Sequence, residues 1–399
     1  MRLVFACTFL AVIFSGYFLG FSQEIPAIDP NFVLGTNDFG LRLLRTVWQQ
    51  ERGNAFVSPV SLATCLAMVA HGAKGATQEE IYRTLGVLAL RERVDEESRK
   101  LIASLDFLSS GITLKMANSL WVEKNAPFFE TYLTAIEDFY QAEGYTVDLT
   151  DPATLPRIND WVRTKTQGTI ERILDSLPEN AVLVLLNATY FKGQWAKAFD
   201  PEHTENLPFT TLQGSKDVPT MWQRGEFAYL ETDTFQAVRL PYTQEALSMY
   251  IFLPKERDGL SALLEALDAQ GLASFIDAMQ EERGEVFLPR LQVSFEKTMN
   301  DVLRELGMVR VFDPYGADLS GMLPVSPAYN AYLSEVRHKT FLEVNEEGTE
   351  AAGVTSGIIA ITAMYPDRFI MRIDHPFFLC IRDERTGVLL FVGAIENPI

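Results

Sequence analysis

Cysteine is scarce in this chain of 399 residues. Only three are present: Cys7 lies in an apolar N-terminal run, and Cys65 and Cys380 each lie inside another apolar stretch. Such positions are typical of small core residues rather than of a disulfide framework. A lone bridge between the last two would not scaffold a chain this long, so we expect a core built by hydrophobic packing, for which 47% hydrophobic residues are sufficient.

Motifs for metal binding and catalysis are missing as well. None of the four histidines stands at metal-ligand spacing from another histidine or a cysteine. The chain has no C-x-x-C, no glycine-rich phosphate-binding pattern and no G-x-S-x-G. We therefore expect no metal, no cofactor and no enzyme activity.

Positive charge is in deficit. The 53 acidic residues outnumber the 34 lysines and arginines, which gives a net charge of −19, and no basic cluster interrupts it. Such a chain repels the phosphates of nucleic acids and the sulfates of glycosaminoglycans. Neither class of polyanion is expected as a partner.

Linkers and repeats are absent too, which favours one large domain over residues 23–399. We expect this domain to be a monomer. Residues 1–22 differ, because Arg2 is followed by an apolar run without charge and then by a polar segment. This pattern is typical of a secretory signal peptide cut near Gln23, so we expect a secreted or extracytoplasmic protein. An uncleaved membrane anchor is the alternative, because the run approaches the ~20 residues that span a bilayer.

Helical patterns concentrate in the first third of the chain. In "SPVSLATCLAMVAHGA", Ser58 is suited to cap a helix that starts at Pro59 and ends near Gly72. The capping-box pattern "TQEE" at residues 77–80 predicts the start of a second helix, which stops at Gly86.

Strand patterns dominate the remainder. The stretch "ITLKMANSLWV" (112–122) alternates, and "AVLVLLNATYF" (181–191) is apolar almost throughout, as in a strand covered on both faces. Asn187 begins a glycosylation sequon, but its place in the second strand indicates a buried structural asparagine. Early helices followed by strands indicate an α+β fold.

One late segment stands out, because no charged residue lies between Glu350 and Asp367. Four blocks, two of them flanking this segment, resemble the serpin family in order and spacing: "NAFVSPVSLATCLAMVAHGAKGATQEEI", "LNATYFKGQWAKAFDPEHTENLPF", "HKTFLEVNEEGTEAAGV" and "DHPFFLCIRDERTGVLLFVGAI". The resemblance covers nearly the whole chain after residue 30. It implies three β-sheets, about nine helices and an exposed reactive-centre loop over residues 346–368.

The resemblance further implies a suicide inhibitor of serine proteases. A protease attacks the loop as substrate and becomes acylated, after which the cleaved loop inserts into the main sheet as a new strand and carries the protease with it. The family positions that form the hinge of this loop are Glu346, Gly348, Thr349, Glu350, Ala351, Ala352, Gly353 and Val354.

Strand alternation tests whether the loop can insert. The inward set from Thr349 is small or β-branched and uncharged: Thr349, Ala351, Gly353, Thr355 and Gly357. The only charge, Glu350, falls on the outward face, together with Val354. An inward charge would cost several kcal/mol unless it were paired, so this pattern favours an inhibitory hinge.

The cleavage point follows from family spacing. Seventeen residues from Glu346 place the reactive bond between Thr362 and Ala363. A small residue there suits elastase-like or subtilisin-like proteases, and trypsin-like targets are disfavoured because no Lys or Arg lies between Glu350 and Arg368. A shift of register to Met364 or Tyr365 would instead select chymotrypsin-like proteases.

Further positions carry over from the family one at a time. Ser58, Ser61, Asn187 and His338 match the shutter, a polar cluster beneath the main sheet, although Asn187 and His338 also fit satisfied core polar groups. Trp195 matches the breach, where insertion begins, and fits an ordinary core aromatic equally well. Glu346 is expected to pair with Arg290, an interaction worth only ~0–1 kcal/mol if exposed.

Two functions compete with inhibition. A non-inhibitory serpin acting as carrier or chaperone usually has bulky, charged or proline residues in its hinge. In residues 348–355 no bulky, charged or proline residue stands at an inward position. An enzyme would need a motif that the chain lacks.

Overall fold

The computed structural model describes residues 26–105, 111–178, 180–211, 213–324, 331–349 and 368–399. Within these ranges the fold is α+β, as expected, with nine α-helices and fifteen strands. The helices are α1 (Pro30–Glu51), α2 (Pro59–Gly72), α3 (Gly75–Thr84), α4 (Val94–Leu105), α5 (Glu130–Tyr140), α6 (Thr154–Lys165), α7 (Leu260–Ala266), α8 (Ala269–Asp277) and α9 (Asn300–Glu305).

The first predicted helix is confirmed and the start of the second is wrong. Ser58 caps α2, because its side chain accepts the N–H of Ser61, and Pro59 opens the first turn. Helix α3 begins at Gly75, so Thr77 lies inside it and does not cap it. The hydroxyl of Thr77 instead accepts the N–H of Asp318, a distant contact that the local pattern does not contain.

The main sheet has six strands in the order β10-β11-β4-β2-β3, with β12 paired to β4. Its strands β4 and β11 are parallel, and Asn187 lies opposite His338 in their register. The bounds are β2 (Ile112–Glu123), β3 (Glu143–Val147), β4 (Leu183–Gln194), β10 (Leu291–Thr298), β11 (Leu333–Val344) and β12 (Gly348–Thr349).

The other two expected sheets are joined into one of nine strands. The long strand β6 connects them, because residues 214–220 pair with β5, residues 220–229 with β9 and residues 229–231 with β7. The bounds are β1 (Ala55–Val57), β5 (Glu205–Thr211), β6 (Gly214–Glu231), β7 (Phe235–Pro241), β8 (Leu247–Pro254), β9 (Gln280–Pro289), β13 (Phe369–Arg372), β14 (Phe377–Asp383) and β15 (Leu389–Ile395).

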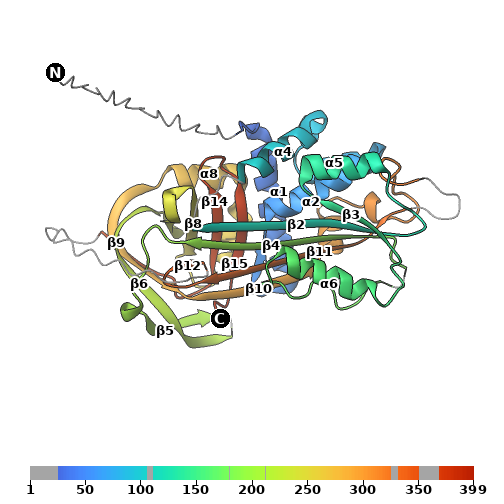
Figure 1. Cartoon of the computed structure of the whole chain (residues 1–399). Coiled ribbons are helices and arrows are strands. Elements are labelled where there is room, and N and C mark those ends of the chain that lie inside the picture. The colour runs from blue at the N-terminus through green and yellow to red at the C-terminus, as the bar shows by residue number, and fades with distance from the viewer. Residues whose placement is uncertain (1–25, 106–110, 179, 212, 325–330, 350–367) are drawn as a thin grey trace, which may run out of the picture.

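Both faces of β4 are covered, as its apolar sequence predicts. Val184 and Leu186 pack in a small core that includes residues of α6, whereas Leu183 and Leu185 belong to the large core that includes α2. Figure 1 shows α2 and α6 on either side of β4. Strand alternation therefore turns Asn187 toward α2. The interpretation of Asn187 as a buried residue is confirmed, since its exposed fraction is 0%.

Cys65 and Cys380 are both fully buried and unpaired, which agrees with their interpretation as core residues. Burial raises the pKa of both thiols. Among the helices in the described ranges, none has the length and apolar character needed to cross a membrane.

Candidate functional site

The chain leaves the main sheet at the end of β11 through a tight turn. Asn345 and Gly348 bridge this turn, since each backbone N–H donates to the other residue's carbonyl, at 2.7 and 3.2 Å. Strand β12 then lies antiparallel to the end of β4, with Thr349 opposite Gly193. Because β11 pairs with β4 only as far as Tyr190, β12 occupies the edge of β4 that β11 leaves unpaired.

Gly348 is required at this position for two reasons. Its φ of +143° lies in a region that side chains rarely adopt. An added Cβ would also lie 2.1 Å from the carbonyl oxygen of Gly193, a contact that forces the backbone to move. Glycine therefore lets the chain approach the edge of β4 closely enough to pair with it.

Substituting Gly348→Ala is expected to detach β12 from β4. The strained backbone and the clash together should cost on the order of 1–3 kcal/mol. This cost exceeds what the hydrogen bonds of two paired residues contribute. Hydrogen exchange followed by mass spectrometry should show faster exchange at Thr349. Gly53→Ala is the control, because nothing lies within 4 Å of a Cβ there; equal exchange in the two variants would contradict the role of Gly348.

Thr349 is fully buried at the end of β12. Its hydroxyl lies 3.1 Å from the hydroxyl of Tyr242, whose ring stacks on Trp195 at 4.6 Å between centroids. The indole of Trp195 donates to the carbonyl of Asn345 at 3.0 Å, and its backbone N–H donates to the carbonyl of Glu347. The proposed breach tryptophan thus contacts the hinge directly and is also a core residue.

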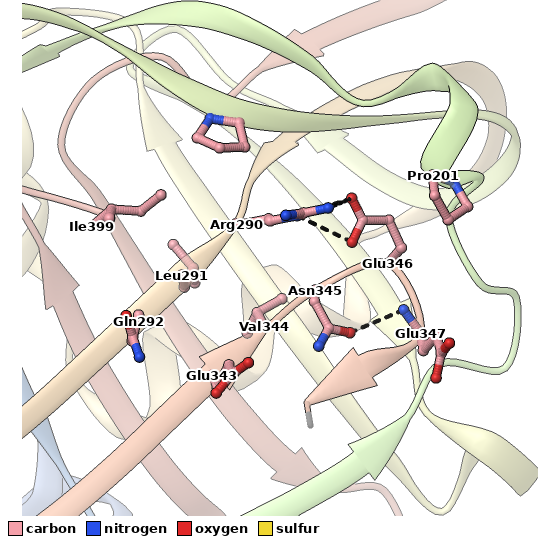
Figure 2. A pocket seen from close by; sticks show the side chains of 11 residues that line it. Pro201, Arg290, Leu291, Gln292, Glu343, Val344, Asn345, Glu346, Glu347 and Ile399 are labelled. Carbon is pink, nitrogen blue, oxygen red and sulfur yellow. Dashed lines mark hydrogen bonds and ion pairs between the residues drawn. The ribbon is translucent and has the colours of Figure 1, made fainter. Parts of the chain in front are cut away.

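The predicted pair between Glu346 and Arg290 is formed, with a buried carboxylate and an exposed guanidinium. The guanidinium of Arg290 donates to both carboxylate oxygens at 2.8–3.1 Å (Figure 2). Thr204 also donates its hydroxyl to this carboxylate, at 2.6 Å. The side chain of Glu346 is only 7% exposed. Burial alone would raise the pKa of Glu346, but these donors outweigh it and hold that pKa below its usual value.

The predicted shutter residues form one buried network. His338 Nε2 accepts the backbone N–H of Ser58 at 3.1 Å, so the neutral ring carries its proton on Nδ1, which faces Asn187 Oδ1. Asn187 Nδ2 donates to the hydroxyl of Ser61 at 2.6 Å. All four residues have an exposed fraction of 0%. The network joins the start of α2 to β4 and β11.

Sequence reasoning missed one member of this network. Asn118 on β2 lies opposite Asn187, and its side-chain oxygen accepts from Asn187 Nδ2 at 2.6 Å. A single polar residue in an otherwise apolar alternation is the signal that identifies it, because a buried amide needs a partner. Three neighbouring strands are therefore linked through side chains as well as through the backbone.

The buried His338 predicts a pH dependence of stability. Burial lowers the pKa of His338 to about 3, whereas an unfolded histidine titrates near 6.5. Between these values the unfolded chain binds a proton that the folded protein does not, so the free energy of unfolding falls as the pH falls, by up to ~1.4 kcal/mol per unit.

Urea unfolding between pH 7 and pH 4 measures this effect. His338→Gln is expected to show a shallower decrease than the unaltered protein. His203→Gln serves as the control, because His203 is exposed and should leave the slope unchanged. Equal slopes in all three proteins would show that His338 does not contribute.

The remaining predicted site residues lie outside the described residues. These are the hinge positions Glu350, Ala351, Ala352, Gly353 and Val354, the reactive bond at Thr362 and Ala363, and the alternatives Met364 and Tyr365. Residues 1–22, the predicted signal peptide, lie outside as well. Of the hinge, Glu346, Gly348 and Thr349 are described, and the neighbouring residues 345 and 347 bond to Trp195. The shutter cluster forms a separate group at the start of α2 and on β4 and β11.

Comparisons with known proteins agree with this architecture. The family model "Serpin (serine protease inhibitor)" matches residues 34–398. The chain is 38% identical to an uncharacterised serpin-like protein of Thermococcus kodakarensis, over 94% of this chain and 87% of that protein. It is 36% identical to the leukocyte elastase inhibitor of Xenopus laevis, over 87% and 93%.

Solved serpin structures also resemble this chain in fold. The thermophilic serpin Tengpin in its native state matches with a TM-score of 0.86 and 28% identity, over 94% of this chain and 96% of that one. Human thyroxine-binding globulin in complex with its hormone matches with a TM-score of 0.83 and 28% identity, over 92% and 98%. A family model spanning residues 34–398, together with relatives above 30% identity over most of their length, establishes that this chain belongs to the serpin family.

Proposed function

We propose that this chain is a secreted suicide inhibitor of serine proteases, and not an enzyme, and that β12 is the first part of the strand that its cleaved loop completes. The observation that carries the proposal is the position of Thr349. This residue is already paired with β4 on the edge next to β11 and fully buried. Continuing the same strand requires only that β4 and β11 separate further.

The energetics favour insertion once the loop is cut. About a dozen new residues in the ladder, at roughly 0.5–1.5 kcal/mol for each hydrogen bond, would contribute on the order of 10 kcal/mol. Separating β4 from β11 must first break the bond between Asn187 and His338, which lie opposite each other on these strands. The network thus holds the sheet closed until the loop supplies new partners.

The target preference remains elastase-like or subtilisin-like proteases, cleaving between Thr362 and Ala363. The similarity to a leukocyte elastase inhibitor supports this choice. Chymotrypsin-like targets through Met364 or Tyr365 are the alternative within the same mechanism. Secretion is proposed from the apolar segment that follows Arg2.

Carrier activity is the second candidate, since thyroxine-binding globulin has a closely similar fold. A carrier does not need to trap a protease. Cleavage of its loop would release an active protease, and no covalent complex would form.

Mixing the protein that starts at Gln23 with elastase, subtilisin, chymotrypsin and trypsin separates these functions. We expect an SDS-resistant complex with elastase or subtilisin and a released peptide whose mass places Ala363 at its N-terminus. Simple cleavage by all four proteases without a complex would exclude inhibition of these classes. A peptide that begins elsewhere would correct the reactive bond without removing the mechanism.

A further inference from the structure

One hydroxyl of the main sheet has no hydrogen-bond partner. Thr189 lies in the middle of β4, and its exposed fraction is 0%. Within the part of the chain that the structure describes, neither a donor nor an acceptor lies within hydrogen-bond distance of its Oγ1. Buried polar groups are normally paired, so this hydroxyl needs a physical explanation.

The surroundings of Thr189 are apolar or already bonded. On the same face of β4, its neighbours two residues away are Asn187 and Phe191. The side chain of Asn187 is bonded within the shutter network, and the ring of Phe191 packs against Phe391 at 5.9 Å between centroids. Neither neighbour therefore supplies a partner for the hydroxyl.

Thr340 provides a comparison on the facing strand. It lies opposite Thr189 in the parallel register of β11 and β4, which Figure 1 shows side by side, and it is equally buried. Its hydroxyl, however, donates to the carbonyl of Phe56 at 2.6 Å. Two threonines at the same level of the sheet thus differ in that one hydroxyl is satisfied and the other is not.

The unpaired hydroxyl destabilises the closed sheet. In the unfolded chain, water bonds to this hydroxyl, and folding removes the water without supplying a substitute. A valine at this position would have nearly the same shape and would have no polar atom to desolvate. The threonine therefore lowers the stability of the intact protein relative to a valine.

The position of Thr189 connects this cost with the opening of the sheet. Insertion of the cleaved loop separates β4 from β11 beside Thr189. The register of β12 on β4 pairs Thr349 with Gly193. Its continuation brings Gly353 opposite Thr189, on the same face of the sheet. Since glycine has no side chain, a strand inserted in this register leaves room beside the hydroxyl for a water molecule.

We propose that the unpaired hydroxyl of Thr189 promotes insertion, because it raises the free energy of the closed sheet more than that of the sheet with an inserted strand. This role rests on the proposed function, since it concerns the insertion of the cleaved loop. Thr189 and the shutter network act in opposite directions. The bond between Asn187 and His338 holds β4 and β11 together, and the hydroxyl two residues farther along β4 weakens that closure.

Urea unfolding at pH 7 tests the cost of the hydroxyl without any protease. Thr189→Val replaces only the hydroxyl by a methyl group, and we expect the folding equilibrium constant of the intact protein to rise roughly tenfold to hundredfold. Thr340→Val is the matched control, because the same change breaks a formed hydrogen bond there and should lower the constant. A Thr189→Val protein that is no more stable than the unaltered protein would overturn the proposal.

Unfolding of intact and loop-cleaved protein in guanidinium chloride separates a role in opening from ordinary packing. We expect Thr189→Val to stabilise the intact protein and to bring little or no gain after cleavage and insertion. Thr189→Ser keeps the hydroxyl and should bring no gain in either form. An equal gain of Thr189→Val in both forms would refute the role in opening, because a purely structural effect does not depend on insertion.

Stopped-flow mixing with elastase or subtilisin measures insertion itself, through the fluorescence of Trp195 beside the hinge. Insertion should be roughly tenfold slower in Thr189→Val and not slower in Thr340→Val. An unchanged rate in a stabilised Thr189→Val protein would reject the role in insertion. If the unaltered protein forms no covalent complex, the proposed inhibitor function fails, while urea unfolding still decides whether the hydroxyl destabilises the closed sheet.

Discussion

Replacing Thr349 with arginine is expected to convert the protein from an inhibitor into a substrate. Thr349 is fully buried, and its hydroxyl contacts Tyr242 beside Trp195. An arginine would bring an unpaired charge into this apolar place, at a cost of several kcal/mol. Because position 349 is already buried in this structure, the cost should detach β12 from β4 before cleavage, and insertion of the loop must then bury the charge again. Since each 1.36 kcal/mol changes a rate tenfold, a rise of ~3–4 kcal/mol in the insertion barrier slows insertion by two to three orders of magnitude.

Hydrolysis of the acyl-enzyme is then faster than insertion of the loop. The loop is therefore cleaved, and the protease is released instead of remaining in a covalent complex. Gel electrophoresis under denaturing conditions should show cleaved Thr349→Arg protein and little or no covalent complex. Thr349→Ser is the matched control, because it keeps the hydroxyl and is smaller, and it should retain most inhibition. A Thr349→Arg variant that traps protease with unchanged stoichiometry would show that position 349 does not enter the sheet during inhibition.

Local patterns predicted those parts of the fold whose partners are close in the sequence. The cap at Ser58 and the doubly covered strand β4 are both explained by neighbouring residues, and both are found in the structure. Strand alternation also placed Thr349 on the inward face, which agrees with its burial. In each case residues that are adjacent in the sequence carry the information.

Features that depend on contacts between distant parts of the chain could not be predicted from local sequence patterns. The pattern at residues 77–80 resembles a capping box, yet Thr77 bonds to Asp318 and Glu80 accepts the N–H groups of Val309 and Arg310. These partners lie more than two hundred residues away. Local sequence therefore cannot distinguish a helix cap from a tertiary contact that uses the same side chains.

Prediction of the hinge from local sequence was limited in the same way. The pairing of Glu346 with Arg290 could be proposed from the sequence, but the burial of the Glu346 carboxylate could not, because this carboxylate also contacts Thr204 from a third part of the chain. Gly348 was named as a family position without its physical reason, which is the approach to Gly193. Residues 350–367 lie outside the described ranges, so the reactive bond is inferred from family spacing alone.

The second large effect is expected at Asn187. Its side chain donates to Ser61 and Asn118 and accepts from His338, all within a fully buried or nearly buried cluster. Asn187→Ala removes three hydrogen bonds and leaves the oxygen of Asn118 and the Nδ1–H of His338 without partners. At ~1–3 kcal/mol for each of these two unsatisfied buried groups, the free energy of unfolding should fall by about 2–6 kcal/mol.

Such a loss is a large part of the ~5–15 kcal/mol that stabilises a typical folded domain. Urea unfolding at pH 7 measures it, and Asn206→Ala on β5 is the control, since Asn206 is exposed and should change the stability by less than ~0.5 kcal/mol. A decrease below 1 kcal/mol for Asn187→Ala would show that the cluster does not hold the strands together.

The same substitution distinguishes a role in closing the sheet from a general role in packing. The bond between Asn187 and His338 spans the two strands that must part, so its loss should destabilise the closed sheet more than a sheet with an inserted strand. Mild heating should therefore convert Asn187→Ala to loop-inserted or polymeric forms faster than it converts the unaltered protein, as native gels can follow. If the variant instead unfolds at lower temperature without faster conversion, the network stabilises the core but does not control opening.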